Sequence, residues 1–511
     1  MELAVLSGVC FLISGVAIRL AVALARRLGV MDRPGGHKRH EASTPFVGGF
    51  GLIAVLVSVS PLIDVFFVDF APLPLSALLL GALAIFLTGL ADDLRNLGFK
   101  LRLLIQALVA LAMVFLGGVE LRSLGELVPG VRFDLGWFAV PVTVFATIGL
   151  INAVNMIDGI DGLSGSVSLV SLSLTAVVAF TAGSGAYLVF IVALMGGVAG
   201  FLYFNLRYPG NVRARVFLGD NGSMLLGFLF AWLFIALSQG EQAAMPPVTA
   251  LWLFALPLMD TVGVMVRRIW LGKSPFRADR YHLHHLFVRA GFRVSDVVAF
   301  AAAMQLVFGL VGVGGLLLGV PDSLMFGLFL GVFGLYFVLI LRPWRVVPWL
   351  RRINRALGLP SVQVRGIFVG YLRKEKYPQL LGMISQGLGG GYDYQLSVYE
   401  TDRSATDGRN VYCVAHIPVD GDEFLIGKIR RDAVRIKRRL AREHGLEVRL
   451  FLCRSSDNDL RSALAAGMDH SRRSVERRGV SSTLIYSIER GQCSLPGDGS
   501  RFEFSVPPAC R

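Results

Sequence analysis

The amino-acid sequence predicts an α-helical, polytopic membrane protein that carries a small soluble α/β domain at its C-terminal end. Composition is the first reason: of the 511 residues, 54% are hydrophobic and 17% are charged, and the mean hydropathy is +0.61. This balance is too apolar for an ordinary soluble protein of the same length. The other two reasons are a series of long apolar runs and the alternating charge of the loops between them.

About eleven of the apolar runs approach the roughly 20 residues that a helix needs to cross a bilayer. They lie, in order, at 2–25, 47–68, 71–91, 99–117, 136–154, 162–182, 185–205, 216–238, 246–266, 295–319 and 322–341. The first run lacks a basic start and ends at Arg26 and Arg27 instead of a small-residue cleavage site. We therefore expect a membrane helix there and no cleaved signal peptide.

Lys and Arg are concentrated in alternate loops, which predicts the orientation of the chain because basic residues in short loops stay in the cytoplasm. The basic set contains Arg33, Arg95, Arg213, Arg277 and Arg345, whereas the opposite set contains Asp64, Asp69, Glu241 and Asp322. The N-terminus is predicted outside and the C-terminus in the cytoplasm. The net charge of +14 suits loops that face anionic lipid and phosphorylated substrates, and we expect no nucleic-acid partner.

Hydrophobicity falls sharply after residue 345. This divides a membrane domain at 1–345 from a cytoplasmic domain at 346–511, for which a regulatory or interaction role is expected. Within the second domain, strands are predicted at 362–372, 394–400, 410–418 and 446–453, and helices at 422–443 and 457–473.

A dense polar segment at 152–163 lies between two of the apolar runs. In a helical segment, the spacing of three residues places Asn152, Asn155, Asp158 and Asp161 roughly on one face. Carboxylates and amides are costly at membrane depth, so such a group favours ion or substrate chemistry. The alternative is that these side chains cap two helices.

Two further acidic motifs are predicted at the same membrane face. Asp92 and Asp93 end the third run, where adjacent carboxylates suit a divalent cation; a solvated pair at the membrane edge would show the same pattern. Asp220 begins the eighth run beside glycines. It either caps that helix or holds Mg²⁺ that bridges phosphate oxygens at the helix N-terminus.

A histidine cluster, His282, His284 and His285, follows Arg280 in the most basic loop. Its spacing does not match a zinc site, and contact with phosphate, with Arg280 as a fixed positive charge, is the better interpretation. Asp260 lies inside the ninth run, where it pairs with a basic residue, lines the site or holds helices together.

Taken in order, these motifs resemble the polyprenyl-phosphate N-acetylhexosamine-1-phosphate transferase family, that is, glycosyltransferase family 4 or the MraY/WecA superfamily. The resemblance covers residues 1–345 and rests on Asp32-Arg33-Pro34 with His37 and Lys38, Asp92-Asp93 with Lys100 and Gln106, and the segments 152–163, 217–223 and 282–285. The segment 274–280 followed by His-x-His-His is similar to the WecA-like branch, whereas MraY-type members resemble a run of three His. Two departures are Asn96, where many members carry a third Asp, and the soluble C-terminal domain.

The resemblance implies transfer of N-acetylhexosamine 1-phosphate, most simply N-acetylglucosamine 1-phosphate, from a UDP-sugar to undecaprenyl phosphate, with release of UMP. This reaction would start lipid-linked synthesis of a cell-surface glycan at the cytoplasmic face of the bacterial inner membrane. Mg²⁺, with Mn²⁺ as the alternative, would bind Asp220, Asp92 and Asp93. The catalytic groups implied are Asp92, Asp93, Asp158, Asp161, Lys100, His282, His284 and His285, and the substrate contacts are Asn152, Asn155, Asp161, Phe217, Arg280 and Lys38.

Alternatives stay open at the level of the sequence. An MraY-like enzyme would transfer phospho-MurNAc-pentapeptide in peptidoglycan synthesis. An ion-coupled transporter is the main interpretation of another class, but it predicts inverted repeats and polar groups near the bilayer midplane, whereas these motifs share one predicted face. The sugar epimer, a homodimer, the partner of the C-terminal domain and the role of an Asp as base or nucleophile are not decided.

Overall fold

The computed structural model describes residues 2–28, 44–66, 74–209, 211, 213–241, 243–272, 274, 282–357 and 359. Beyond these it describes six C-terminal strands and the isolated helical positions 435, 438, 439 and 442. The chain divides into two compact units, which are treated separately below. The first comprises Met1–Arg33, Ala42–Phe287 and Val294–Trp349, and the second comprises Pro34–Glu41, Val288–Arg293 and Leu350–Arg511.

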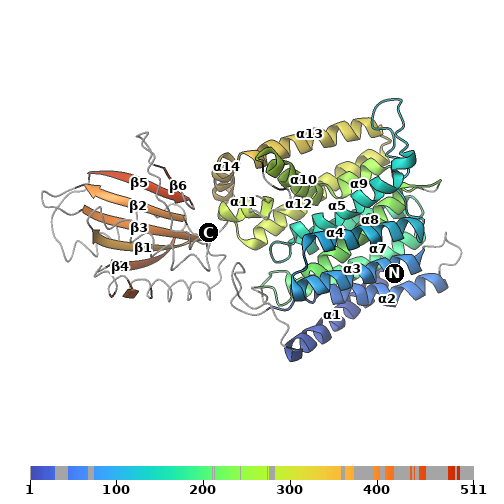
Figure 1. Cartoon of the computed structure of the whole chain (residues 1–511), viewed down its shortest axis with the longest axis horizontal. Helices are drawn as coiled ribbons and strands as arrows, with labels where there is room; N and C mark the ends of the chain where they lie inside the picture. Colours follow the sequence, from blue (N-terminus) through green and yellow to red (C-terminus); the bar gives the residue numbers. More distant parts are fainter. Residues whose placement is uncertain are drawn as a thin grey trace. The chain divides into compact units, whose positions relative to one another are not determined.

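The first unit is a helical bundle, and a helix occurs in each of the predicted apolar runs (Figure 1). The elements are α1 (Glu2–Leu28), α2 (Gly48–Phe66), α3 (Leu75–Arg95), α4 (Phe99–Phe115), the short 3₁₀ helix η1 (Gly136–Phe138), α5 (Ala139–Ile157), α6 (Leu163–Thr181), α7 (Gly185–Asn205), α8 (Gly219–Ser238), α9 (Pro247–Leu253), α10 (Ala255–Trp270), α11 (Leu283–Arg289), α12 (Val294–Leu317), α13 (Asp322–Leu341) and α14 (Pro343–Ala356).

Among the described residues, 8 helices are long and apolar enough to cross a membrane, or 9 if the bent pair α9 and α10 is one span. The predicted number of about eleven is higher because it also includes α4, with 17 residues, and α2, whose apolar part is Gly48–Pro61. The molecule is therefore a predominantly helical protein with several candidate membrane spans.

Helix α8 is the core of the bundle, with 94% of its apolar window buried inside the protein. Helices α2, α3, α5 and α9 pack against it, and its Trp232, Phe228 and Phe230 side chains are fully buried. A helix that is apolar on all sides belongs inside a bundle. Consequently, the polar motif at the start of α8 is surrounded by the ends of its neighbours.

The ninth apolar run, predicted as one membrane span, contains a break: α9 and α10 meet at Phe254 at an angle of 85°. A break frees backbone groups that water cannot satisfy at membrane depth, so another part of the protein must bind them. Gln305 of α12, which is 0% exposed, does so. Its Oε1 accepts the backbone N–H of Leu256 at 3.0 Å, and its Nε2 donates to the carbonyl of Leu253 at 2.8 Å.

The C-terminal strands form one antiparallel sheet in the order β4-β1-β3-β2-β5-β6 (Figure 1). They are β1 (Gln363–Leu372), β2 (Gln395–Asp402), β3 (Arg409–Pro418), β4 (Val448–Ser455), β5 (Ser481–Glu489) and β6 (Gln492–Ser494). The first four lie close to the predicted ranges, whereas β5 and β6 were not predicted. The helices expected at 422–443 and 457–473 fall almost wholly outside the described residues, so the α/β class of this domain stays a prediction.

Candidate active site

The N-terminus of α8 is capped by a carboxylate from another helix. Asp93, near the end of α3, accepts the backbone N–H of Asp220 at Oδ1 (3.0 Å) and that of Asn221 at Oδ2 (3.1 Å). These N–H groups are among those that a helix start leaves without partners inside the helix. Gly89 lets the two helices approach, because a Cβ there would lie 2.4 Å from the Asp220 carbonyl oxygen. Asp93 therefore fixes the position of Asp220.

Asp92 and Asp220 converge on a single guanidinium group. Arg102, in the first turn of α4, donates from Nη1 to Oδ2 of Asp92. The same nitrogen lies 3.6 Å from Oδ2 of Asp220. Asp92 is buried, whereas the Asp220 side chain is 31% exposed. Two carboxylates this close repel each other unless a positive charge lies between them, and here Arg102 supplies that charge.

Helix α5 contributes an amide to the same place. Asn155 donates from Nδ2 to Oδ1 of Asp220 at 2.6 Å and to Oγ of Ser223 at 2.9 Å. Asn152, one turn earlier, donates instead to Oε1 of Gln106 on α4 at 2.8 Å. The structure thus brings Asn155 to the carboxylates, while Asn152 joins α5 to α4.

The segment 152–163 is not a single helix, so the expectation that its four polar side chains share one helical face is wrong. Helix α5 ends at Ile157 and α6 begins at Leu163. Gly162 has a φ of +83°, a left-handed conformation that glycine adopts without the penalty of a Cβ. The chain therefore turns between the two helices, so Asp158 and Asp161 do not continue the face of α5.

Asp158 and Asp161 have separate partners in this turn. The Ser164 hydroxyl donates to Oδ1 of Asp158 at 2.5 Å, but burial outweighs this bond and raises the pKa of Asp158 to about 7. Asp161 is buried, and its Oδ2 accepts Nε of Arg207 (2.8 Å) and the backbone N–H of Ala214 (3.2 Å). Asp161 thus anchors the turn to the segment between α7 and α8, whereas Asp158 can change protonation near neutral pH.

The start of α11 and the residue before it bring the three histidines together. The ring of His284 stacks on that of His282 with 5.8 Å between centroids, and it lies 4.2 Å from that of His285. His284 is 3% exposed, and neither ring nitrogen has a hydrogen-bond partner among the described residues. Burial, reinforced by His285, lowers the pKa of His284 well below its usual range, so this ring is neutral. A Cβ on Gly159 would lie 2.3 Å from Nε2 of His284, which places the cluster directly on the turn after α5.

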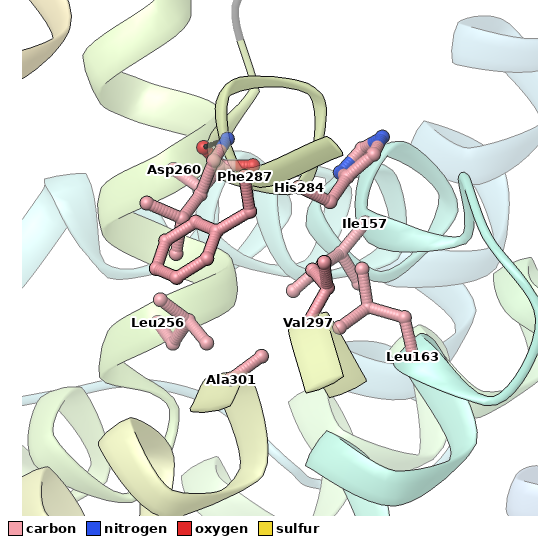
Figure 2. A pocket seen from close by; sticks show the side chains of 9 residues that line it. Ile157, Leu163, Leu256, Asp260, His284, Phe287, Val297 and Ala301 are labelled. Atoms are coloured by element: carbon pink, nitrogen blue, oxygen red, sulfur yellow. Dashed lines mark hydrogen bonds between the residues drawn. The ribbon is translucent and has the colours of Figure 1, made fainter. Parts of the chain in front are cut away.

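A pocket lies beside the histidine cluster (Figure 2). Its wall includes the apolar side chains of Ile157, Leu256 and Ala301, and its polar lining side chains are Asp260 and His284. Figure 2 shows these two polar groups at the same end of the pocket. The turn after α5, helix α10 and the histidine cluster therefore meet in one region of the bundle.

The remaining predicted residues have varied positions. The ring of Phe217 lies 5.7 Å from that of Phe46, and Lys100 is exposed at the start of α4. Asn96 caps the end of α3 with a φ of +50°, a conformation that asparagine tolerates better than most residues. Lys38 and Arg280 lie outside the described residues.

Arg102, Ser164, Arg207 and Tyr336 contact predicted residues but were not predicted themselves. The sequence contained a signal for Arg102, because an arginine at the start of an apolar helix needs a nearby acidic or polar partner. Tyr336 had no such signal, because a tyrosine in an apolar helix is ordinary.

The donor set fits a divalent cation that shares its ligands with a substrate. Among the described residues there is no group of three or more His, Cys, Asp or Glu side chains arranged to hold a metal ion. Mg²⁺, however, is usually held by one or two carboxylates together with substrate phosphates. Asp92 and Asp220 supply two carboxylates that already share a cationic partner, whereas both oxygens of Asp93 accept N–H groups.

Acidic and amide side chains at the ends of α3, α5 and α8, together with the histidine cluster, are typical of the functional site of an integral membrane enzyme. The chain belongs to glycosyl transferase family 4, whose model matches residues 75–238. The match runs from α3 to α8 and includes Asp92, Asp93, Asp158 and Asp220.

Similar proteins carry the name undecaprenyl-phosphate alpha-N-acetylglucosaminyl 1-phosphate transferase. The one from Yersinia pestis is 36% identical over 355 residues, which is 69% of this chain and 95% of the relative. The protein from Escherichia coli strain K12 is 35% identical over 350 residues, or 68% of this chain and 93% of the relative. That from Haemophilus influenzae is 36% identical over 333 residues, or 65% of this chain and 92% of the relative.

Proposed function

We propose that this protein transfers N-acetylglucosamine 1-phosphate from UDP-N-acetylglucosamine to undecaprenyl phosphate and releases UMP, which starts a lipid-linked cell-surface glycan. The observation that carries the proposal is the convergence of Asp92 and Asp220 on Arg102, with Asn155 bonded to Asp220. The names of the relatives support the choice of sugar and lipid, because this chain covers 95% and 93% of the length of two of them.

The reaction exchanges one phosphoanhydride for another. A phosphate oxygen of undecaprenyl phosphate attacks the β-phosphorus of the UDP-sugar, the bond to the bridging oxygen breaks, and UMP leaves with that oxygen. The second pKa of a phosphate monoester lies near about 6, so the attacking lipid phosphate is already mostly dianionic at neutral pH. The site therefore has to align two anions and neutralise them, and it needs little proton transfer.

Each residue contributes to alignment or charge neutralisation according to its position. Asp92 and Asp220 would hold Mg²⁺, which supplies charge neutralisation for the diphosphate when bound. Arg102 contributes a fixed positive charge beside them. Asn155 orients the Asp220 carboxylate, and Asp93 holds the helix end on which Asp220 lies. The histidine cluster and Lys100 would contact phosphate oxygens, and the rings of Phe217 and Phe46 would accept the uracil base.

The proposal includes a topology of eleven spans with the site on the cytoplasmic face of the bacterial inner membrane, where nucleotide sugars occur. The broken pair α9 and α10 counts as one of these spans, and α2 and α4 as two more. The contrast between basic and acidic loops supports this orientation. Cysteine accessibility to a membrane-impermeant reagent tests it: a single cysteine placed at Lys100 should be protected in intact cells, and one placed at Asp134 should react.

A panel of donors tests the activity. Membranes containing the protein are incubated with Mg²⁺, undecaprenyl phosphate and labelled UDP-N-acetylglucosamine, UDP-N-acetylgalactosamine or UDP-MurNAc-pentapeptide, and UMP and labelled lipid are followed. We expect transfer from UDP-N-acetylglucosamine. Transfer only from the pentapeptide nucleotide would indicate the MraY-like alternative, and no transfer from any donor would overturn the proposal.

The C-terminal domain is proposed to regulate the enzyme or bind a partner. Truncation after Ala356 tests this. Unchanged transfer in membranes with altered glycan output in cells supports regulation, whereas loss of transfer by a stably folded truncated protein would assign the domain a part in catalysis.

A further inference from the structure

Asp260 occupies the centre of a buried hydrogen-bond network beside the histidine cluster. It lies on the bent helix α10, its side chain is 2% exposed, and both of its oxygens accept hydrogen bonds. Oδ2 contacts Nδ1 of His282 at 2.9 Å. Oδ1 accepts the backbone N–H of Leu283 at 2.9 Å and the hydroxyl of Tyr336 at 2.6 Å.

Two of these contacts converge on the first turn of α11. The N–H of Leu283 belongs to the first residue of that helix, which needs an external acceptor. His282 immediately precedes it, so Asp260 fixes both the backbone and the imidazole at the start of the histidine motif. Asp260 thus bonds to two successive residues of one motif, which is more than a carboxylate needs if it only joins neighbouring helices.

The contact with Asp260 also decides which nitrogen of His282 carries the proton. A carboxylate accepts, so Nδ1 must be the donor and Nε2 is left as the nitrogen that can accept a proton or, when protonated, donate to an anion. Among the described residues, His282 contacts Asp260 and the rings of two histidines: that of His284 is stacked on it, and that of His285 is tilted, with 6.3 Å between centroids. Tyr336 reaches this group through Asp260. Carboxylates in this position orient ligand histidines in many metal and catalytic sites.

Tyr336 completes the network from the last long helix of the bundle. It lies on α13, 76 residues after Asp260, and is buried. Its hydroxyl provides a third donor to a carboxylate that would otherwise be buried with fewer bonds, and unsatisfied buried charge is costly. This hydroxyl touches Asp260 and not the histidine itself, so any effect on His282 passes through the carboxylate.

We propose that Asp260 and Tyr336 are positioning residues for His282, which they hold with Nδ1 protonated and Nε2 directed to a substrate phosphate. This inference rests on the proposed function, because it assigns His282 a phosphate ligand. Under this proposal α13 contributes to catalysis through Tyr336, in addition to its role as a helix of the bundle.

The sharpest test is Tyr336→Phe, which removes one hydroxyl and keeps the ring. Loss of one hydrogen bond to a charged acceptor should lower kcat roughly 3- to 10-fold, with a smaller change in KM for UDP-N-acetylglucosamine. Tyr187→Phe is the matched control, since Tyr187 is a half-buried tyrosine on α7 far from this network in sequence, and it should leave kcat unchanged.

A double-mutant cycle separates positioning from packing. Asp260→Asn should lower kcat more than Tyr336→Phe does, because the amide can no longer hold Nδ1 as a donor. If Tyr336 acts through Asp260, the double variant will be no worse than Asp260→Asn alone, whereas independent packing effects multiply. If a thermal unfolding assay shows that Asp260→Asn does not fold, the kcat of Tyr336→Phe, compared with that of Tyr187→Phe, tests the positioning role.

Wild-type kcat in a folded Tyr336→Phe variant would overturn the inference while leaving the proposed function intact. Absence of transfer by the wild-type protein with every UDP-sugar would overturn the proposed function instead, so the two failures are distinguishable.

Discussion

Oδ1 of Asp93 accepts the backbone N–H of Asp220 at 3.0 Å, across 127 residues of sequence. The bond makes the end of α3 the cap of α8, so that the carboxylate pair Asp92-Asp93 is divided between two tasks. Asp93 holds the helix, and Asp92 faces Arg102 and Asp220. Adjacent acids that look equivalent in the sequence therefore have different consequences when removed.

Asp93→Ala should destabilise the bundle, because two N–H groups at the start of α8 lose their acceptor. Loss of a helix cap costs about 0.5–2 kcal/mol, which should be measurable as a lower thermal unfolding temperature in detergent. Asp134→Ala is the control, since the Asp134 side chain is 67% exposed. Equal unfolding temperatures for the two variants would contradict the capping role.

Asp220→Asn should abolish transfer, with kcat reduced by at least about 100-fold, the usual cost of removing one group that stabilises charge in the transition state. The unfolding temperature should change little, because Asn can still accept the amide of Asn155. UMP release is the readout, and Asp322→Asn at the start of α13 serves as the control. Substantial activity in Asp220→Asn would remove this residue from the proposed metal site.

Arg102→Gln should make the stability of the protein depend more strongly on Mg²⁺. Without the guanidinium, Asp92 and Asp220 repel each other, and a cation that binds only the folded state then stabilises it by mass action. We expect a lower unfolding temperature in EDTA and a larger rise on addition of Mg²⁺ than in the wild type. The exposed Arg122→Gln provides the comparison, and an identical Mg²⁺ response in both variants would contradict the shared-cation geometry.

The raised pKa of Asp158, about 7 in the folded protein against about 3.9 in an unfolded chain, predicts a pH-dependent stability. The folded protein binds this proton more tightly than the unfolded chain does. The stabilisation is therefore complete below about pH 4 and is lost as the pH rises through about 7. Asp158→Asn cannot ionise, so it should lose less stability than the wild type over this range.

Thermal unfolding of both proteins at about pH 5 and about pH 8 measures the difference. Parallel pH profiles for wild type and Asp158→Asn would show that Asp158 keeps an ordinary pKa in the folded state.

Much of the membrane unit follows from local chemistry. The length of the apolar runs and the charge of the loops predict the helices. The polar motifs, which are costly near a membrane, predict Asp92, Asp158 and Asp220 as site residues. These signals are local because the residues that carry them are close together in the chain. Pro257 is a local signal for a helix break near Phe254, because proline removes a helical hydrogen bond and its ring clashes with the carbonyl of Leu253, but the neighbouring sequence does not show what stabilises the resulting bend. The bend depends on Gln305, which bonds to backbone groups 49 and 52 residues away in the sequence and satisfies them.

The sequence by itself determined that this is a many-helix membrane protein with acidic, amide and histidine motifs, since composition and the length of the apolar runs are sufficient for that, and the order of those motifs resembles glycosyl transferase family 4. Only the tertiary structure decided what each motif contacts: Asp93 caps α8, Asp161 pairs with Arg207, and Asp260 joins His282 to Tyr336. Hydrogen bonds of about 3 Å depend on the register between distant helices, and that register is set by packing of the whole bundle.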